Sequence, residues 1–207
     1  NGGILDDLIV TNVGDYLFLV VNASRKQEDM DHLAAHLGAD CALDELGDRA
    51  LLALQGPMAA AVLDRIIPGV AQLGFMTAAP FKVDGVPLAV TRSGYTGEDG
   101  FEISIPSEAA DGFARRLLTQ DDVAPAGLGA RDSLRLEAGL CLYGHEMDET
   151  TTPIEAGLAW TIARRRRDEG GFPGAAIIQT QLADGVSRRR VGILPEGRAP
   201  AREHTVV

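Results

Sequence analysis

The chain has 207 residues, of which 45% are hydrophobic and 24% charged, an ordinary composition for a globular protein that buries a core. Its net charge of −11 argues against non-specific binding to nucleic acid, which needs a basic surface. No apolar run is long enough to cross a bilayer, so a membrane is not an expected partner. The two cysteines, Cys41 and Cys141, are too few for a disulfide framework or a metal cluster and are interpreted as small core residues.

The first predicted elements form a hairpin with two acids near its base. Residues 4–10 predict a strand that contains Asp6 and Asp7, and residues 16–21 predict its antiparallel partner, which ends at Asn22. Successive side chains of a strand face opposite ways, so the two acids cannot both look into the same space. One acid needs a partner, and tight strand pairing brings Asn22 close to both.

The next segments alternate between helical and strand patterns. Ser24 is the predicted N-cap of a helix that runs through Gly38. Residues 43–46 and 50–54 predict strands, and a helix is expected to begin near Pro57 because proline suits the first turn.

The stretch from Arg92 to Glu102 is the most distinctive in the chain, and a hairpin predicted over residues 81–91 leads into it. Glycines at 94, 97 and 100 permit positive φ and close approach to a ligand. The alternation after them predicts a strand with Phe101 facing inward and Glu102 on the opposite face. A plain hairpin connection is the alternative interpretation.

A helix capped by Ser107 and a helix over residues 128–140 follow. Leu134 lies three positions after Arg131, which places Arg131 on or beside the apolar flank of the second helix. An arginine there marks either a carboxylate in a structural ion pair or an anionic ligand, and both interpretations are open.

The remaining predicted elements are a short helix opened by Pro153, a helix over residues 172–182 and a strand over residues 188–194. The short helix brings Trp160 into register, either as a core residue or as a ring on which a ligand stacks.

Two arginine clusters, at 164–167 and 188–190, stand out against the acidic background. They predict either a docking patch for an acidic partner or local salt bridges. His145 lies near several acids, but the spacing fits no known zinc or calcium pattern, so no metal site is predicted.

The fold class predicted from these elements is α+β, because hairpins are evident and the strict strand–helix–strand rhythm is absent. Residues 48–118 suggest a ferredoxin-like split arrangement of strands and helices.

Five ordered motifs together resemble one family along essentially the whole chain. The sequence is similar to the T-protein family of the glycine cleavage system, the tetrahydrofolate-dependent aminomethyltransferases, at Asp6-Asp7, Leu54-Gln55-Gly56-Pro57, Tyr95-Thr96-Gly97-Glu98-Asp99-Gly100, Ala130-Arg131-Asp132-Ser133-Leu134-Arg135 and Thr152-Pro153.

The resemblance implies a three-domain cloverleaf around a central folate cavity. We therefore expect a partial chain without the N-terminal segment and most of the C-terminal domain. Residues 1–47 would belong to the first folate-binding domain, and residues 48–186 to the ferredoxin-like region with part of a second α/β domain. Residues 187–207 would begin a truncated C-terminal β-barrel.

The resemblance also implies roles for individual residues. Asp7, the second acid of the Gly-Gly-Ile-Leu-Asp-Asp motif, corresponds to the family's catalytic aspartate. Glu102 corresponds to the glutamate that binds the pteridine ring, and Arg131 to another folate-site residue. The positions of Tyr95, Asn22 and Trp160 match residues that line the same cavity. No metal is implied.

The implied reaction passes the one-carbon unit of an aminomethyl group from the dihydrolipoyl arm of H-protein to tetrahydrofolate and releases ammonia. Tetrahydrofolate is then a co-substrate and lipoylated H-protein the protein partner. The implied compartment is the cytoplasm in a bacterium or the mitochondrial matrix in a eukaryote.

Two other functions stay open. One is a related folate-dependent enzyme of the dimethylglycine, sarcosine or sulfoniopropionate demethylating type, although the paired acids and the arginine helix favour the T-protein. The other is a non-catalytic folate-binding relative that serves iron–sulfur assembly.

Overall fold

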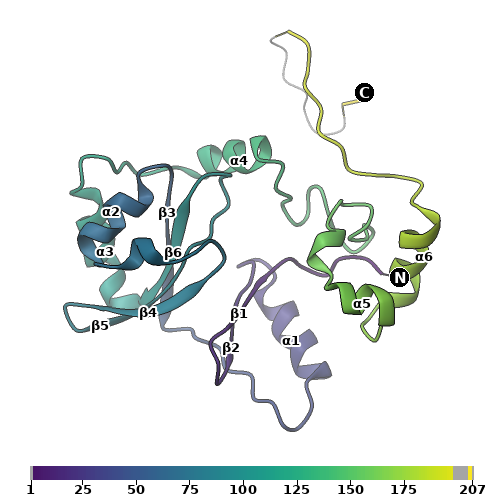
Figure 1. Cartoon of the computed structure of the whole chain (residues 1–207), viewed down its shortest axis with the longest axis horizontal. Helices are drawn as coiled ribbons and strands as arrows, with labels where there is room; N and C mark the ends of the chain where they lie inside the picture. Colours follow the sequence, from purple (N-terminus) through teal and green to yellow (C-terminus); the bar gives the residue numbers. More distant parts are fainter. Residues whose placement is uncertain (1, 198–204, 207) are drawn as a thin grey trace. The chain divides into compact units, whose positions relative to one another are not determined.

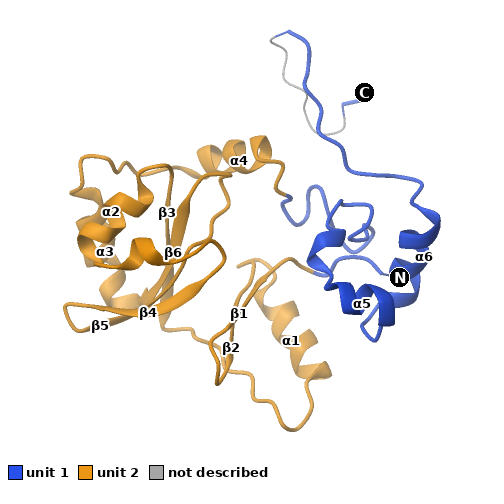
Figure 2. Ribbon diagram, viewed as in Figure 1, with its two compact units in different colours: residues 1–5, 141–207 blue, residues 6–140 orange. Residues whose placement is uncertain are grey.

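The computed structural model describes residues 2–197 and 205–206. The chain forms two compact units, one made of residues 1–5 and 141–207 and the other of residues 6–140 (Figure 2). Helices and antiparallel strands are both present, so the predicted α+β class is confirmed. No helix in the described residues is long and apolar enough to cross a membrane.

The unit of residues 6–140 begins with a two-stranded hairpin and a helix. Strands β1 (Ile9–Asn12) and β2 (Leu17–Val20) pair antiparallel, and helix α1 (Lys26–His36) follows. The first strand starts later than the predicted residue 4. Ser24 does not cap α1, because the N-cap is Arg25 and no side chain caps the first turn.

A four-stranded antiparallel sheet with two helices forms the core of the same unit (Figure 1). Its elements are β3 (Arg49–Gln55), α2 (Ala59–Ile66), the 3₁₀ turn η1 (Val70–Gln72), β4 (Ala78–Val83), β5 (Val86–Thr91), β6 (Gly100–Pro106) and α3 (Ser107–Leu118). The strand order is β3-β6-β5-β4. The predicted hairpin of β4 and β5 is confirmed, and its turn residues Asp84 and Gly85 both have positive φ.

Both helices cover one face of this sheet. One continuous cluster of buried side chains joins Val62, Leu63 and Ile66 of α2 and Phe113 and Leu117 of α3 to alternate residues of the strands. In β6 these are Phe101, Ile103 and Ile105, each at most 1% exposed. Glu102, the next residue, therefore faces the side of the sheet opposite α2 and α3, as the alternation predicts.

The sheet differs from the predicted ferredoxin-like arrangement in its connections. In a βαββαβ unit the last strand follows the second helix, whereas here all four strands precede α3. The reason is the short turn over residues 92–99, which joins β5 directly to β6 and leaves no room for a helix between them.

Helix α4 (Leu128–Glu137) ends three residues before the predicted residue 140. Gly139 takes positive φ after it, and the Leu140 amide donates to the Arg135 carbonyl while the Gly139 amide donates to the Leu136 carbonyl. This is the Schellman pattern, in which a left-handed glycine ends a helix.

The unit of residues 1–5 and 141–207 contains η2 (Ala159–Thr161), α5 (Arg164–Glu169) and α6 (Ala175–Asp184). Its small core consists of Ile4, Cys141, Met147 and Ala156. Cys141 is buried as predicted, whereas Cys41 is exposed and the prediction that it is a core residue is wrong.

Two predicted elements of this unit are absent from the described residues. Residues 151–155 form turns in place of a helix, although Thr152 and Glu155 make the reciprocal hydrogen bonds of a helix-capping box. Residues 188–194 form no strand, because Arg188 and Arg190 instead bond to Glu155 and Ala156. In the other unit, residues 43–46 likewise form no strand.

The start of a C-terminal barrel therefore stays a prediction, and residues 198–204 and 207 lie outside the described part of the chain. The compact units divide the chain after residues 5 and 140, whereas the sequence predicts domain boundaries after 47 and 186. Those boundaries remain a prediction about the family's domains.

Candidate functional site

The paired acids meet at the base of the β1–β2 hairpin, where one amide binds both. Ile9 pairs with Val20, so continuing the register by two residues brings Asp7 opposite Asn22. The Asn22 Nδ2 donates to Asp6 Oδ1 at 2.9 Å and to Asp7 Oδ1 at 2.8 Å, with the Asp7 carbonyl at 3.2 Å. The sequence prediction that Asn22 returns to the acids is confirmed.

The electrostatics of this group favour a proton on Asp7 more than in an ordinary aspartate. Partial desolvation raises the pKa of the Asp7 carboxyl, the Asn22 hydrogen bond lowers it, and repulsion from Asp6 raises it again. The Asp7 side chain remains exposed, so a ligand can reach it.

A third acid, Asp29, belongs to the same group and escaped the sequence analysis. It lies in the first turn of α1, is only 8% exposed, and shares a side-chain hydrogen bond with Asp6. In the sequence it stands beside Glu28 on a polar helix and resembles an ordinary first-turn acid. Only its burial distinguishes it.

Glu102 lies on the face of the four-stranded sheet opposite α2 and α3, as predicted. Its Oε2 accepts a hydrogen bond of 2.8 Å from the Ser93 hydroxyl, which in turn lies 2.8 Å from the Thr91 hydroxyl. A carboxylate offers about four lone-pair positions. The contact with Ser93 therefore orients Glu102 and leaves acceptor capacity for a ligand.

The turn between β5 and β6 is fixed by Arg92. Its guanidinium makes two hydrogen bonds to Asp99, at 2.8 and 2.7 Å, and two more to the carbonyls of Ala71 and Leu73. These contacts with Arg92 hold the pKa of the Asp99 carboxyl below its ordinary value. The protein's own contacts thus tie this turn to Ala71 and Leu73 through Arg92.

The glycines of this turn serve the protein's own packing. A Cβ on Gly94 or Gly100 would lie 1.7 Å or 2.4 Å from the Gln55 side chain, and a Cβ on Gly97 would lie 2.7 Å from Ala138. Of the three, only Gly97 has positive φ. The close approach predicted from the glycines is real, but the group that approaches Gly94 and Gly100 is Gln55.

Tyr95, in the same turn, meets Arg131 from α4. The Arg131 guanidinium lies 4.8 Å from the centre of the Tyr95 ring, a cation–π contact. Arg131 is exposed, and the structural ion pair of this helix is instead made by Arg135, which is 4% exposed and bonds to Asp132. Of the two interpretations left open for Arg131, the structural ion pair thus belongs to its neighbour one turn later.

Trp160 lies in the other compact unit, within η2, and is 75% exposed. It is not a core residue. The interpretation that remains for it is a ring available to a ligand.

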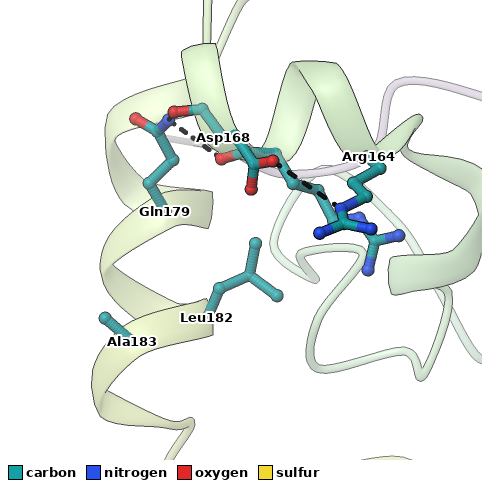
Figure 3. Close-up of a pocket in the computed structure, with 6 residues that line it drawn as sticks. Arg164, Asp168, Gln179, Leu182 and Ala183 are labelled. Carbon is teal, nitrogen blue, oxygen red and sulfur yellow. Dashed lines mark hydrogen bonds and ion pairs between the residues drawn. The ribbon is translucent and has the colours of Figure 1, made fainter.

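The arginine cluster of residues 164–167 forms α5 and is partly neutralised within that helix. Arg164 lies 4.0 Å from Asp168, and Arg165 lies 3.1 Å from Glu169. A shallow pocket lies between α5 and α6 (Figure 3). It is lined by Arg164, Arg167, Asp168, Gln179, Leu182 and Ala183. The Gln179 amide donates to the carbonyls of Arg167 and Asp168 and so ties the two helices together.

No group of three potential ligands among the described histidines, cysteines and acids is arranged to hold a metal ion. The acids near His145 have local roles, since Asp148 accepts hydrogen bonds from Thr150 and Thr151, and Glu146 accepts one from the Leu142 amide. These carboxylates shape turns.

The predicted site residues thus form two contact groups, Asp7 with Asn22 and Tyr95 with Arg131, with Glu102 held by Ser93 at the end of Tyr95's turn. The convergence of Asp7, Glu102 and Arg131 on one pterin-sized cavity remains a prediction.

Comparison with known proteins finds similarity along the whole chain. Residues 1–166 match the model of the GCVT N-terminal domain. The mitochondrial aminomethyltransferase of Dictyostelium discoideum is 47% identical over 223 residues, and that of Pisum sativum is 48% identical over 216 residues. Both alignments cover all of this chain, which spans 55% and 53% of those proteins.

A solved structure is similar as well. The glycine cleavage system aminomethyltransferase T from Bartonella henselae matches with a TM-score of 0.89 and 46% identity over 97% of this chain. The match covers 55% of that protein, so this chain spans about half the length of its relatives.

Proposed function

Because this chain belongs to the T-protein family defined by the GCVT domain, we propose that it forms part of an aminomethyltransferase of the glycine cleavage system. The proposed reaction moves the one-carbon unit from the aminomethylated dihydrolipoyl arm of H-protein to tetrahydrofolate. The products are 5,10-methylenetetrahydrofolate, ammonia and the reduced dihydrolipoyl arm. The observation that carries the proposal is similarity along the whole chain to proteins of this activity.

The proposed role of Glu102 is recognition of the pterin. The pterin edge presents adjacent N–H donors, and a carboxylate accepts two such donors side by side. Glu102 projects from a buried strand and is oriented by Ser93, so it is held in place before the ring arrives. A preorganised acceptor of this kind selects folates by orientation as well as by charge.

The proposed role of Asp7 is electrostatic. Positive, iminium-like charge develops on the transferred carbon as ammonia leaves, and a carboxylate beside it stabilises that charge. The Asn22 amide holds one Asp7 oxygen at 2.8 Å and so limits the rotation of the carboxylate. Asp7 would also orient the attacking folate nitrogen.

Arg131, Tyr95, Asn22 and Trp160 are proposed to line the folate cavity. The Arg131 guanidinium, which lies 4.8 Å from the centre of the Tyr95 ring, is proposed to contact an anionic tail of the folate. Trp160 offers an exposed ring surface for stacking.

The proposed partner is lipoylated H-protein, which supplies the one-carbon unit. The similar proteins of Dictyostelium discoideum and Pisum sativum are named mitochondrial. We propose the mitochondrial matrix for a eukaryotic source and the cytoplasm for a bacterial one.

The experiment that tests this function replaces Asp7 with asparagine in a full-length protein carrying this chain. Asp7→Asn removes the charge and keeps the size, so we expect folate to bind normally and turnover to fall by at least ~100-fold. Turnover is measured with lipoylated H-protein, ammonia and methylenetetrahydrofolate. Asp15→Asn, in the exposed hairpin turn of the same unit, is the matched control and should leave turnover unchanged.

Near-normal turnover of Asp7→Asn would remove Asp7 from the mechanism. Turnover of the unaltered protein with dimethylglycine in place of H-protein would instead assign it to the demethylating branch. Folate binding without turnover of any donor would support the non-catalytic alternative.

A further inference from the structure

Asp29 is the one strongly buried acid in the described part of the acidic group around Asn22. Its side chain lies against Asp6 from the first turn of α1, and its amide donates to the Arg25 carbonyl at 2.9 Å. One of its carboxyl oxygens, Oδ2, is buried without a hydrogen-bond partner. A carboxyl group placed this way is costly unless it carries a proton.

Asp6 links this buried acid to Asn22. Its Oδ1 accepts from the Asn22 side-chain amide at 2.9 Å, and its Oδ2 lies 3.4 Å from the Asn22 backbone amide. Two carboxyl groups form a hydrogen bond only when one of them is protonated, because ionised carboxylates only accept. The contact between Asp29 and Asp6 therefore needs a proton on the pair.

The Asn22 amide has two hydrogens and three acceptors nearby. The two shortest contacts, to Asp6 Oδ1 and Asp7 Oδ1, take one hydrogen each, and the Asp7 carbonyl at 3.2 Å is the weaker third. If Asp6 rotates away, the amide loses one of its two strong anchors. Asp7 then loses a donor of fixed orientation.

We propose that Asp29 is a positioning residue, which donates a hydrogen bond to Asp6 and so holds the Asn22 amide in the orientation that fixes Asp7. We call the hydrogen-bonded set of Asp29, Asp6 and Asn22 the clamp. Its importance for catalysis rests on the proposed function, in which Asp7 acts on the transferred carbon. The hydrogen bonds from Asn22 to Asp6 and Asp7 do not depend on the proposed function.

The charges around Asp29 give the clamp a pH dependence. Burial raises the pKa of Asp29 to about 6, and the hydrogen bond and repulsion from Asp6 and the charge of Glu28 act in the same direction, while Arg25 opposes them. Below that pH the pair shares a proton and the clamp is closed. Above it both carboxylates are charged and repel each other.

The test uses the 207-residue chain and three variants. Asp29→Asn keeps a donor at every pH, Asp29→Ala removes it, and Asp31→Ala alters an exposed acid of the same helix as the control. The readout is the side-chain amide signal of Asn22 in ¹⁵N NMR spectra recorded between pH 4 and pH 8.

We expect the Asn22 signal of the unaltered chain and of Asp31→Ala to shift with a midpoint near pH 6. Asp29→Asn should remove the shift with a midpoint near pH 6 and leave only the change that comes from Asp7, whose pKa also lies above its ordinary value. Below pH 6, Asp29→Ala should displace the signal from its position in the unaltered chain. A midpoint near pH 6 that persists in Asp29→Asn, or an unchanged signal in Asp29→Ala, overturns the proposal.

The pH dependence of the unfolding equilibrium gives a second readout, which does not rely on the Asn22 signal. The pKa of Asp29 is raised in the folded chain, so its contribution is fully present below pH 3.8 and is lost as the pH rises through about 6. The unfolding equilibrium constant of Asp29→Asn should therefore match that of the unaltered chain at low pH and be smaller above pH 6. Equal pH profiles contradict the assignment of the proton to Asp29.

Activity separates this inference from the proposed function. In a full-length protein assayed below pH 6, where Asp29 carries its proton, Asp29→Ala should lower kcat and Asp29→Asn should restore it. Unchanged kcat in Asp29→Ala overturns the positioning role. If the unaltered protein does not turn over, the proposed function is what fails, and the Asn22 signal still decides the role of Asp29.

Discussion

At the scale of single residues, two aspartates of this chain have pKa values that are shifted in opposite directions. Asp99 is bound by a guanidinium, which lowers its pKa, whereas Asp29 is buried beside another carboxylate, which raises its pKa. Both are aspartates in a chain with many acids, and composition does not distinguish them. The neighbours in space decide whether the proton is held or released.

The Arg92–Asp99 pair leads to a prediction about stability and pH. Lysine cannot reproduce the two parallel bonds to Asp99 together with the two carbonyl contacts, so Arg92→Lys should lower the free energy of unfolding by about 1–3 kcal/mol near pH 7. The pKa of Asp99 is depressed, so the stabilisation is present above its ordinary pKa of 3.8 and is lost as the pH falls further.

Urea unfolding of both proteins at pH 7 and at pH 3 measures this effect. The difference between Arg92→Lys and the unaltered chain should be largest at pH 7 and smaller at pH 3. A difference that stays constant with pH would mean that Arg92 acts through the Ala71 and Leu73 carbonyls alone.

Residue-level prediction succeeded where strand alternation governs. The inward position of Phe101 and the outward position of Glu102 followed from a period of two, and both are confirmed. On α4 the three-residue spacing left Arg131 open between an ion pair and an anionic ligand, and the structure shows that the buried ion pair is made by Arg135. Helical spacing places several residues near the apolar flank, and packing selects one of them.

At the scale of elements, the turn between β5 and β6 is built around Gln55 of the neighbouring strand β3. The two hydrogens of the Gln55 amide are shared among the carbonyls of Leu54, Ser93 and Phe101, with Ser93 nearest at 3.1 Å, and its oxygen accepts from the Thr96 hydroxyl. The side chain fills the space that side chains at Gly94 and Gly100 would need. The Leu-Gln-Gly-Pro motif and the glycine-rich turn are therefore one structural unit.

This packing makes Gly94→Ala a test. The added Cβ would overlap the Gln55 side chain, and we expect a loss of about 1–3 kcal/mol in the free energy of unfolding. In a Gln55→Ala background the clash disappears, so the same substitution should cost much less. Gly112→Ala, in α3 with open space around it, is the control and should stabilise by about 0.5–1 kcal/mol.

Urea unfolding of the four proteins of this cycle measures the coupling. An equal cost of Gly94→Ala with and without Gln55 would show that another contact requires the glycine. The Gly94 backbone has no positive φ, so conformational strain does not supply that alternative.

Element boundaries were predicted best where a single local rule applies. The Asp84-Gly85 turn and the helix that follows Pro57 are found close to their expected positions. The helix expected after Thr151 does not form. A capping box satisfies only the first amides, and the following residues form turns. A cap initiates a helix only when side-chain packing sustains it.

At the scale of the whole molecule, the chain of two compact units spans about half the length of its relatives. The match to the GCVT N-terminal domain extends over residues 1–166 and so includes residues of both units. The acidic group, Glu102 and the Tyr95–Arg131 contact belong to one unit and Trp160 to the other.

The arginines of α5 allow a prediction about the proposed partner. Two of the four are paired within the helix, but the helix remains a local concentration of positive charge in a chain of net charge −11. For a full-length protein we expect Arg165→Glu with Arg166→Glu to raise the KM for lipoylated H-protein and to weaken its dependence on salt.

The control for this prediction makes the same charge change elsewhere. Arg115→Glu with Arg116→Glu reverses two arginines of α3, which are paired with Asp111 and Asp84, and it should leave the KM for H-protein unchanged. If both double variants behave alike, net charge alone governs the encounter. If neither has an effect, the cluster serves only local pairing.

The sequence by itself determined the α+β class, the hairpin predicted over residues 81–91, the inward and outward faces of β6 and the family. These depend on periodicity, turn chemistry and ordered motifs, all of which are local along the chain. Only the tertiary structure decided that Asp29 is buried against Asp6, that Gln55 fills the glycine turn and that Arg135 makes the ion pair of α4. Burial and partner choice depend on residues distant in sequence, and no local pattern records them.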